Sequence, residues 1–155
     1  TDKIFNNDKN MFMEYIPSYY DEYTVDIYYD KGGNLKSFVP RLRLETRSGE
    51  ISKGVTKNNF VYGFLLNKLP NLVGAKGCVT LQVLVSEKEK IFKAIEINPR
   101  FGGGYPLSYS AGANFPKMLI REYILDEKID FFDSWNADLL MLRYDANILL
   151  NDYKA

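Results

Sequence analysis

A pair of alternating segments near the middle of the chain limits the fold more than any other feature of the sequence. Apolar residues recur at every second position in most of Gly77–Val85 and Ile91–Asn98, on either side of the polar run Ser-Glu-Lys-Glu-Lys. Because successive side chains of a strand point to opposite faces, this alternation predicts two half-buried strands joined as an antiparallel hairpin. A symmetric turn about Lys88 would set Gln82 opposite Ala94.

Shorter patterns extend the hairpin into one domain. In chain order the expected elements are a strand at 23–29, a strand at 35–45, a helix at 58–69, the hairpin, a helix at 114–125 and a strand within 138–144. β-Branched and aromatic residues support the strands, and Asn114 with Pro116 is suited to begin a helix. We therefore expect residues 1–155 to form a single α+β domain, an antiparallel sheet with helices mainly on one face.

Charge balance and missing residue types exclude several kinds of chemistry. Lys plus Arg and Asp plus Glu each number 20, so the chain lacks the basic excess of a general nucleic-acid binder. No apolar run reaches the roughly 20 residues that span a bilayer, and we expect no signal peptide. Without histidine and with one cysteine, Cys78, the chain has no catalytic triad, zinc site or internal disulfide, and we expect a cytoplasmic protein.

Polar side chains gather at the end of the second hairpin strand. Glu96 and Asn98 occupy alternate positions and share one face, whereas Ile95 and Ile97 are expected to point into the core. Gln82 on the neighbouring strand lies diagonal to Glu96 on the same face. Carboxylate and amide oxygens are ligands that Mg²⁺ prefers, so these residues are candidates for a metal site.

Arg100 and Gly102–Gly104 follow this strand directly. Arginine can pair with a phosphate or a carboxylate, and glycines let backbone N–H groups approach an anion closely. Two simpler interpretations remain open. A Glu-x-Asn pair is often only a solvated strand face, and a glycine run is often only a flexible turn.

Two motifs in this region resemble the segment that closes the ATP-grasp fold. They are Ile-Glu-Ile-Asn-Pro-Arg-Phe-Gly-Gly-Gly at 95–104 and Ala-Gly-Ala-Asn-Phe-Pro at 111–116. The sequence is most similar to the large subunit of carbamoyl-phosphate synthase and its short-form relatives. The resemblance implies that Glu96 and Asn98 bind the Mg²⁺ (or Mn²⁺) that bridges the ATP phosphates. It also implies that Gln82 assists and that Arg100 contacts phosphate or an acyl-phosphate intermediate.

The N-terminal region carries a second resemblance. Met-Glu-Tyr-Ile-Pro at 13–17 and Asp-Glu-Tyr-Thr-Val-Asp at 21–26 are similar to the family's hinge segment and the strand after it. By this resemblance the backbone around Glu14, Tyr15 and Ile16 would bind the adenine edge, and the Glu22 carboxylate would bind the ribose hydroxyls. An ordinary exposed strand residue is the simpler interpretation of Glu14.

A third group of charged residues lies between these motifs. Arg41, Arg43 and Glu45 alternate on one face of the expected strand at 35–45, and Lys53 follows the next turn. Arg43 or Lys53 could reach a phosphate and stabilise the charge that develops during phosphoryl transfer. Equally, these residues could form a surface charge ladder.

The resemblance implies only part of an enzyme. It extends to about residue 125, whereas a full ATP-grasp enzyme also has an N-terminal α/β domain and a lid with a phosphate-binding Lys. Neither is found in this sequence, which starts without Met, so we expect them in a missing upstream region of the same protein.

The expected function is a fragment of an ATP- and Mg²⁺-dependent ligase, inactive alone. The parent enzyme would activate an unidentified carboxylate as an acyl phosphate for attack by an amine or similar nucleophile. One alternative is a non-catalytic ATP-grasp-derived module that binds nucleotide or a partner chain. Another is an unrelated α+β domain. Whether a homo-oligomer forms through an exposed face is left open.

Overall fold

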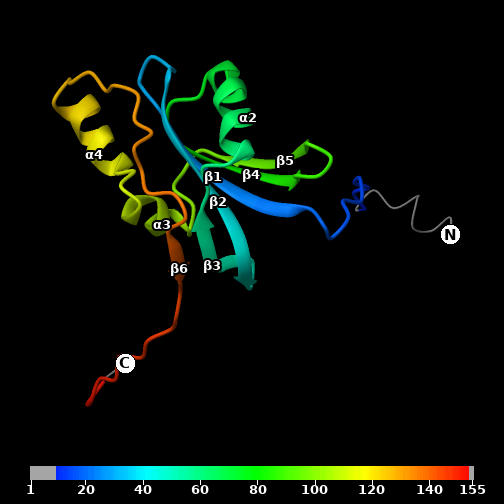
Figure 1. The fold of residues 1–155 in the computed structure, drawn as a ribbon. Coiled ribbons are helices and arrows are strands. Elements are labelled where there is room, and N and C mark those ends of the chain that lie inside the picture. The colour runs from blue at the N-terminus through cyan, green and yellow to red at the C-terminus, as the bar shows by residue number, and fades with distance from the viewer. Residues whose placement is uncertain (1–9, 154–155) are drawn as a thin grey trace.

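The computed structural model describes residues 10–153, and within them six strands form one antiparallel sheet (Figure 1). The strands are β1 (Asp21–Tyr29), β2 (Leu35–Arg47), β3 (Glu50–Thr56), β4 (Gly77–Ser86), β5 (Ile91–Asn98) and β6 (Leu140–Leu142). Their order across the sheet is β5-β4-β1-β2-β3-β6, which places β1 between β2 and β4. The expected α+β class with an antiparallel sheet is therefore confirmed.

Helix α2 (Phe60–Lys68) follows β3. Asn59 caps it, because its side-chain oxygen accepts a hydrogen bond from the Val61 N–H at 3.1 Å. The helix passes into a short 3₁₀ turn, η1 (Leu69–Asn71), where Pro70 cannot continue an α-helix. The expected helix at 58–69 is confirmed.

Two further helices follow β5: α3 (Tyr105–Ser110) and α4 (Phe115–Leu119). The Asn114 side chain accepts a hydrogen bond from the Lys117 N–H at 2.9 Å and so caps α4, as expected. Helix α4 continues into a π-helical turn, η2 (Ile120–Ile124), so the helix expected at 114–125 is present. The sequence did not predict α3, which is only six residues long.

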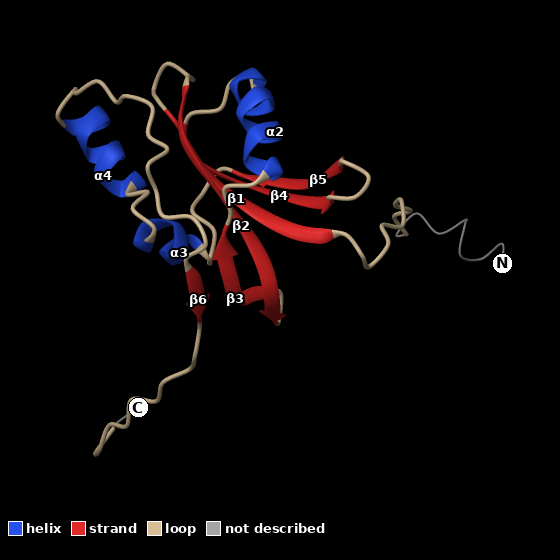
Figure 2. Cartoon of the chain, viewed as in Figure 1, coloured by secondary structure: helices blue, strands red, loops and turns tan. Residues whose placement is uncertain are grey.

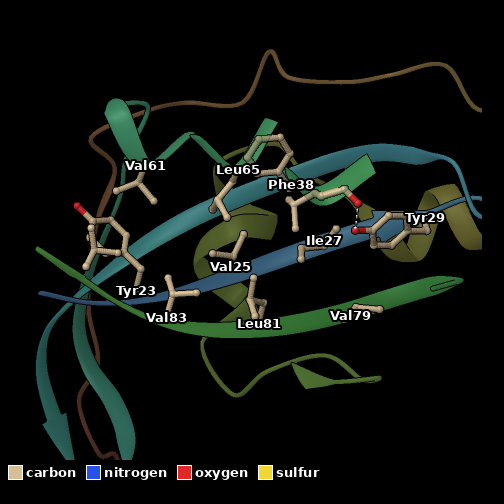
Figure 3. Packing of buried hydrophobic residues seen from close by; sticks show 12 residues of the cluster. Tyr23, Val25, Ile27, Tyr29, Phe38, Val61, Leu65, Val79, Leu81 and Val83 are labelled. Carbon is tan, nitrogen blue, oxygen red and sulfur yellow. Dashed lines mark hydrogen bonds between the residues drawn. The ribbon is translucent and has the colours of Figure 1, made fainter. Parts of the chain in front are cut away.

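One face of the sheet packs against α2, and this contact forms the first core (Figure 3). Its buried members are Tyr23, Val25, Ile27, Tyr29, Phe38, Val61, Leu65, Leu69, Val79, Leu81, Val83 and Val85. Val61, Leu65 and Leu69 follow at helical spacing and present one apolar stripe to the strands. The Tyr29 hydroxyl is also satisfied there, because it donates to the Leu69 carbonyl at 2.8 Å.

The opposite face carries the second core, beneath α3 and α4. Its buried members are Tyr28, Val39, Tyr105, Ala111, Ala113, Phe115, Ile129 and Trp135. Because β1 and β2 contribute to both cores, the centre of the sheet is buried on both faces. Helices therefore cover both faces, with α2 on one side and α3 and α4 on the other, instead of lying mainly on one (Figure 2).

The β4–β5 hairpin forms as expected but in a different register. Gln82 pairs with Glu96, and Val83 pairs with Ala94, so Ile95 forms a β-bulge. The expected pairing of Gln82 with Ala94 is therefore wrong. The turn holds four residues, 87–90, and the bulge adds one more to β5.

Ile95 and Ile97 are not core residues, contrary to expectation. They are 46% and 50% exposed, because β5 is the edge strand of the sheet and no further strand within residues 10–153 pairs with it. Ile97 instead lines an apolar hollow of about 330 Å³ between α2 and the hairpin, together with Phe64 and Phe92.

None of the helices found in residues 10–153 has the length and apolar character that crossing a membrane requires.

A buried hydrogen bond joins the π-helical turn η2 to the sheet. The Tyr28 hydroxyl of β1 donates to Glu122 Oε2 at 2.6 Å, and the Lys31 backbone N–H donates to Glu122 Oε1 at 2.9 Å. Glu122 is only 4% exposed. Burial and the neighbouring Glu122 carboxylate both raise the pKa of Tyr28, which keeps its hydroxyl protonated as a donor.

Tyr28→Phe is expected to lower the free energy of unfolding by about 1–3 kcal/mol, because it leaves the buried Glu122 carboxylate without one of its donors. Urea denaturation followed by far-ultraviolet circular dichroism measures the change. Tyr19→Phe is the matched control, since the Tyr19 hydroxyl donates to Glu89 in an exposed position. Equal stability of the two variants would contradict a structural role for the Tyr28–Glu122 contact.

Candidate functional site

A polar pocket lies on the sheet face opposite α2, where β1, β2, β4 and β5 meet the loop that leads to α3. It has a volume of about 180 Å³. Its lining consists of Thr24, Arg41, Arg43, Gly49, Glu50, Ile51, Thr80, Gln82, Glu96, Asn98, Arg100, Gly102, Gly103 and Gly104. Within this lining, three arginines and two glutamates meet on strands and turns that lie far apart in the sequence.

Gln82, Glu96 and Asn98 converge on one side of this pocket. The Asn98 side-chain N–H donates to Glu96 Oε1 at 2.9 Å, so the two residues share a face as the alternation predicted. The bulge at Ile95 brings Gln82 directly opposite Glu96. A carboxylate and two amides therefore lie together on two neighbouring strands.

The orientation of the Gln82 amide follows from its neighbours. With its nitrogen toward Glu96 Oε1 and its oxygen toward Arg43 Nη1, both contacts measure 2.6 Å and both are hydrogen bonds. The reverse orientation sets the nitrogen 3.3 Å from Glu22 Oε1 but makes it face the Arg43 donor. We prefer the first orientation, because two donors at that distance repel each other.

Arg43 of β2 also lines the pocket. It forms an ion pair with Glu22 of β1 and donates from Nη2 to the Gly49 carbonyl at 2.7 Å. The Arg43 side chain is 8% exposed and the Glu22 side chain 32% exposed. Sequence analysis predicted that both residues contact the nucleotide. In the structure they form an ion pair with each other and lie next to Gln82, one of the candidate metal ligands.

A buried ion pair lies next to the glycine loop, residues 102–104. Arg41 of β2 donates to Asp26 of β1 from Nε at 2.7 Å and from Nη2 at 3.1 Å, and the Ser108 hydroxyl of α3 donates to Asp26 Oδ2 at 2.5 Å. The side chains of Arg41 and Asp26 are 1% and 2% exposed. Sequence analysis identified neither Asp26 nor Ser108 as part of the site, because their partners lie far away along the chain.

Two glycines of this loop lie close to neighbouring side chains. The contact limits substitution at Gly104, because Arg41 is buried and hydrogen-bonded, whereas Gly103 faces the end of the exposed Glu50 side chain. A Cβ on Gly104 would lie 2.1 Å from Arg41 Nη1, and a Cβ on Gly103 would lie 2.1 Å from Glu50 Oε2. Gly104 has a φ of −91°, which any residue can adopt. Glycine is therefore needed at this position because it has no side chain, and not because of its backbone freedom. Protein side chains thus occupy the space beside these two glycines.

Arg100 is anchored through its backbone at the entrance to this loop. Its carbonyl accepts a hydrogen bond from the Thr80 hydroxyl at 2.8 Å, and its side chain donates from Nη1 to the Phe101 carbonyl at 3.1 Å. Within the described residues, Arg100 forms no ion pair, although it is one of the residues that line the pocket. The charge of its guanidinium is therefore not neutralised by a neighbouring carboxylate.

The other predicted site residues do not line the pocket. Lys53 bonds to Glu45 at 2.5 Å, as the charge-ladder alternative describes. Glu14 accepts hydrogen bonds from Lys93 at 3.0 Å, and Tyr15 is 83% exposed in the segment that leads to β1. Ile16 is partly buried in the same segment.

The donor set suits one hard cation and an anionic ligand. Within residues 10–153 no three Asp, Glu, Cys or His side chains gather at a possible metal position, so a cation would depend on Glu96 with amide oxygens. Mg²⁺ commonly takes one or two carboxylates and leaves other positions to phosphate and water, which fits this set. The residues that line the pocket are thus chemically compatible with a cation beside a phosphate or carboxylate.

Sequence comparison identifies the family. Residues 6–140 match the family described as ATP-grasp in the biosynthetic pathway with Ter operon. The chain therefore belongs to this ATP-grasp family. Among curated proteins, none matches the sequence significantly.

Solved structures share the fold. The biotin carboxylase domain of Hydrogenobacter thermophilus 2-oxoglutarate carboxylase, in complex with MgADP, ADP and bicarbonate, aligns with a TM-score of 0.63 and 17% identity, over 81% of this chain and 29% of that one. Campylobacter jejuni biotin carboxylase aligns with a TM-score of 0.55 and 19% identity, over 70% and 26% of the two chains. Kluyveromyces lactis urea carboxylase aligns with a TM-score of 0.58 and 15% identity, over 80% and 12%.

These alignments show the fold alone, and this chain spans less than a third of each neighbour. The ATP-grasp prediction is confirmed by the family match. All three of these neighbours are carboxylases or carboxylase domains, so the finer resemblance to carbamoyl-phosphate synthase stays a prediction.

Proposed function

We propose that this chain is the C-terminal, metal-binding part of an ATP-dependent ligase and supplies part of its ATP site. The observation that carries the proposal is the convergence of Glu96, Asn98 and Gln82 on one pocket with Arg43 and Arg100. A solvated strand face would not need to gather these groups from three strands and a loop. Membership of the ATP-grasp family supports the same function.

The proposed metal ligands are Glu96 and Asn98, with Gln82 assisting. Carboxylate and amide oxygens are ligands that Mg²⁺ (or Mn²⁺) takes. In this structure the Asn98 and Gln82 amides direct N–H groups to Glu96 Oε1, so each amide would rotate to present its oxygen to the cation. When bound, the cation supplies positive charge beside the phosphates of ATP. Glu96 and Asn98 orient it from a strand whose position is fixed by pairing with β4.

The proposed nucleotide contacts are divided between the pocket and its surroundings. Arg43 lies within the pocket lining, and its partner Glu22 is partly exposed. Glu22 would accept hydrogen bonds from the ribose hydroxyls, although it does not itself line the pocket. The backbone of Glu14, Tyr15 and Ile16 would offer the adenine edge a donor and an acceptor. Lys53, at 49% side-chain exposure, would need to leave Glu45 to reach a phosphate.

The proposed reaction proceeds in two steps. A carboxylate oxygen attacks the γ-phosphorus of ATP, the bond to the β-phosphate oxygen breaks, and ADP leaves. An amine or similar nucleophile then attacks the acyl carbon, and inorganic phosphate leaves. Arg100 would hold the transferred phosphoryl group or the acyl phosphate, because this residue lines the pocket and forms no ion pair with any described carboxylate.

The rest of the ATP site would come from other parts of the same protein. An N-terminal α/β domain and a lid would cover the open side of this pocket, and the chain alone would be inactive. This chain's short span of its structural neighbours supports that division. The finer proposal is a ligase that resembles carbamoyl-phosphate synthase.

Calorimetric titration of Mg·ADP into the chain tests the metal and nucleotide assignment. Glu96→Gln is expected to weaken Mg²⁺-dependent binding at least about tenfold, because an amide replaces the only carboxylate among the proposed metal ligands. Glu87→Gln is the matched control, since Glu87 lies exposed in the β4–β5 turn and makes the same change of charge.

The outcomes separate the alternatives. Loss of binding in Glu96→Gln alone supports the metal site. Equal Mg·ADP affinity in all three proteins would rule out Glu96 as a ligand. If the isolated chain binds no Mg·ADP, the same variants are compared in the full-length protein, and persistent absence of binding there favours the non-catalytic module.

A further inference from the structure

We propose that Arg41 is a positioning residue, whose buried guanidinium sets the path of the loop from Arg100 to Gly104. The inference rests on the proposed function only for the role of that loop in binding nucleotide. The claim that Arg41 fixes the path of the loop depends only on contacts within the chain. Arg41 does not need to touch a ligand to act in this way.

Hydrogen bonds to Asp26 fix the position of the Arg41 side chain. Two of its nitrogens donate to Asp26, at 2.7 and 3.1 Å, which fixes the plane of the guanidinium against β1. Asp26 is held in turn by the Ser108 hydroxyl at 2.5 Å. The three residues come from β2, β1 and α3, so the network joins the sheet to the helix that follows the loop.

The guanidinium of Arg41 also lies close to the loop backbone at Gly102 and Gly104. A Cβ on Gly104 would meet Arg41 Nη1 at 2.1 Å, and a Cβ on Gly102 would meet Arg41 Nη2 at 3.6 Å. The backbone at both glycines therefore runs close to the guanidinium group. Thr80 holds the other end of the segment through the Arg100 carbonyl at 2.8 Å.

This arrangement links Arg41 to the groups proposed to bind the ligand. Arg100 precedes the supported segment, and Asn98 precedes Arg100 with a hydrogen bond from the Arg100 N–H to the Asn98 carbonyl at 2.8 Å. A displacement of the loop would therefore move Arg100 relative to the pocket. Lysine at position 41 would keep the charge but lose the planar fork that contacts both Asp26 and the loop.

A double-mutant cycle in the 155-residue chain tests the proposal. The variants are Arg41→Lys, Gly104→Ala and their combination, with Gly63→Ala as control because nothing lies within 4 Å of a Cβ there. Ser108→Ala serves as a milder variant that removes a donor to Asp26 but no charge. The readout is amide hydrogen exchange by nuclear magnetic resonance at Tyr105, whose N–H donates to the Gly102 carbonyl at 3.0 Å.

Exchange at Leu72, whose N–H donates to the Leu69 carbonyl at 3.0 Å on the α2 face, corrects for global stability. Arg41→Lys and Gly104→Ala are each expected to raise the Tyr105-to-Leu72 ratio of exchange rates about tenfold, and Ser108→Ala less. The double variant is expected to show less than the product of the single effects, because the contact between the two positions is already lost. Gly63→Ala leaves the ratio unchanged.

Two results would overturn the proposal. One is an unchanged ratio in Arg41→Lys, and the other is a double variant equal to the product of the single effects. Mg·ADP titration adds the functional part, with about tenfold weaker binding expected in Arg41→Lys and unchanged binding in Gly63→Ala. Wild-type affinity in Arg41→Lys would overturn the role in the site. If the wild-type chain binds no Mg·ADP, the comparison moves to the full-length protein. Absence of binding there as well would count against the proposed function and leave the exchange result to decide the positioning role.

Discussion

Asp26→Ala is expected to lower the free energy of unfolding by about 3–5 kcal/mol, because it leaves the Arg41 guanidinium buried without its counter-ion. The side chain of Arg41 is 1% exposed, so water cannot replace the lost carboxylate. The Ser108 hydroxyl loses its acceptor at the same time. Small domains unfold with free energies of about 5–15 kcal/mol, so the change would remove much of the total and is measurable by urea denaturation.

Two further variants complete this experiment. Asp21→Ala removes an exposed carboxylate from the same strand and is expected to change the free energy of unfolding by less than about 0.5 kcal/mol. Combining Asp26→Leu with Arg41→Met removes both charges and is expected to recover most of the lost stability. Wild-type stability in Asp26→Ala would contradict the buried pair.

Arg100→Ala in the full-length protein is expected to lower kcat of the proposed ligase reaction by about 10²–10³-fold, because the variant loses one cationic group that we propose stabilises the transferred phosphoryl charge. The effect is expected because Arg100 lines the pocket and forms no ion pair in the described part of the chain. The fold should be unaffected, because the Thr80 hydroxyl bonds to the Arg100 backbone and not to its side chain.

ADP formation measures the turnover of this variant, and Mg·ADP titration measures its affinity for nucleotide. Loss of kcat with affinity largely retained would indicate a contact made mainly in the transition state. Arg121→Ala is the matched control, since Arg121 pairs with Glu127 outside the pocket. Equal turnover in the two variants would remove Arg100 from the proposed reaction.

Local signals in the sequence predicted much of the fold. The β4–β5 hairpin follows from apolar alternation, and the start of α4 follows from Asn114, whose side chain caps the helix as expected. Strand β3 lacks such a signal, because Glu50, Ser52 and Lys53 alternate poorly with apolar residues. It forms because β2 offers it a partner along most of its length.

In the candidate site too, contacts between residues near in sequence were predictable, whereas contacts between distant segments were not. Glu96 and Asn98 share a face because they are two residues apart on one strand, so their proximity was predictable. The bulge at Ile95, which brings Gln82 opposite Glu96, depends on the conformation of a single residue and leaves no pattern in the sequence. The bond between Asp26 and Ser108 joins residues 82 positions apart and needs the complete sheet before it can form.

The position of β1 at the centre of the sheet also affects how the chain folds. Strand β1 pairs with β2, which follows it directly, and with β4, which is synthesised only after β3 and α2. A growing chain can therefore close the β1–β2 hairpin early, while the other edge of β1 stays unpaired until β4 leaves the ribosome. Contacts between distant segments form slowly, and an open strand edge can pair with another chain. Newly made molecules are thus most prone to aggregation in the interval before β4 is complete.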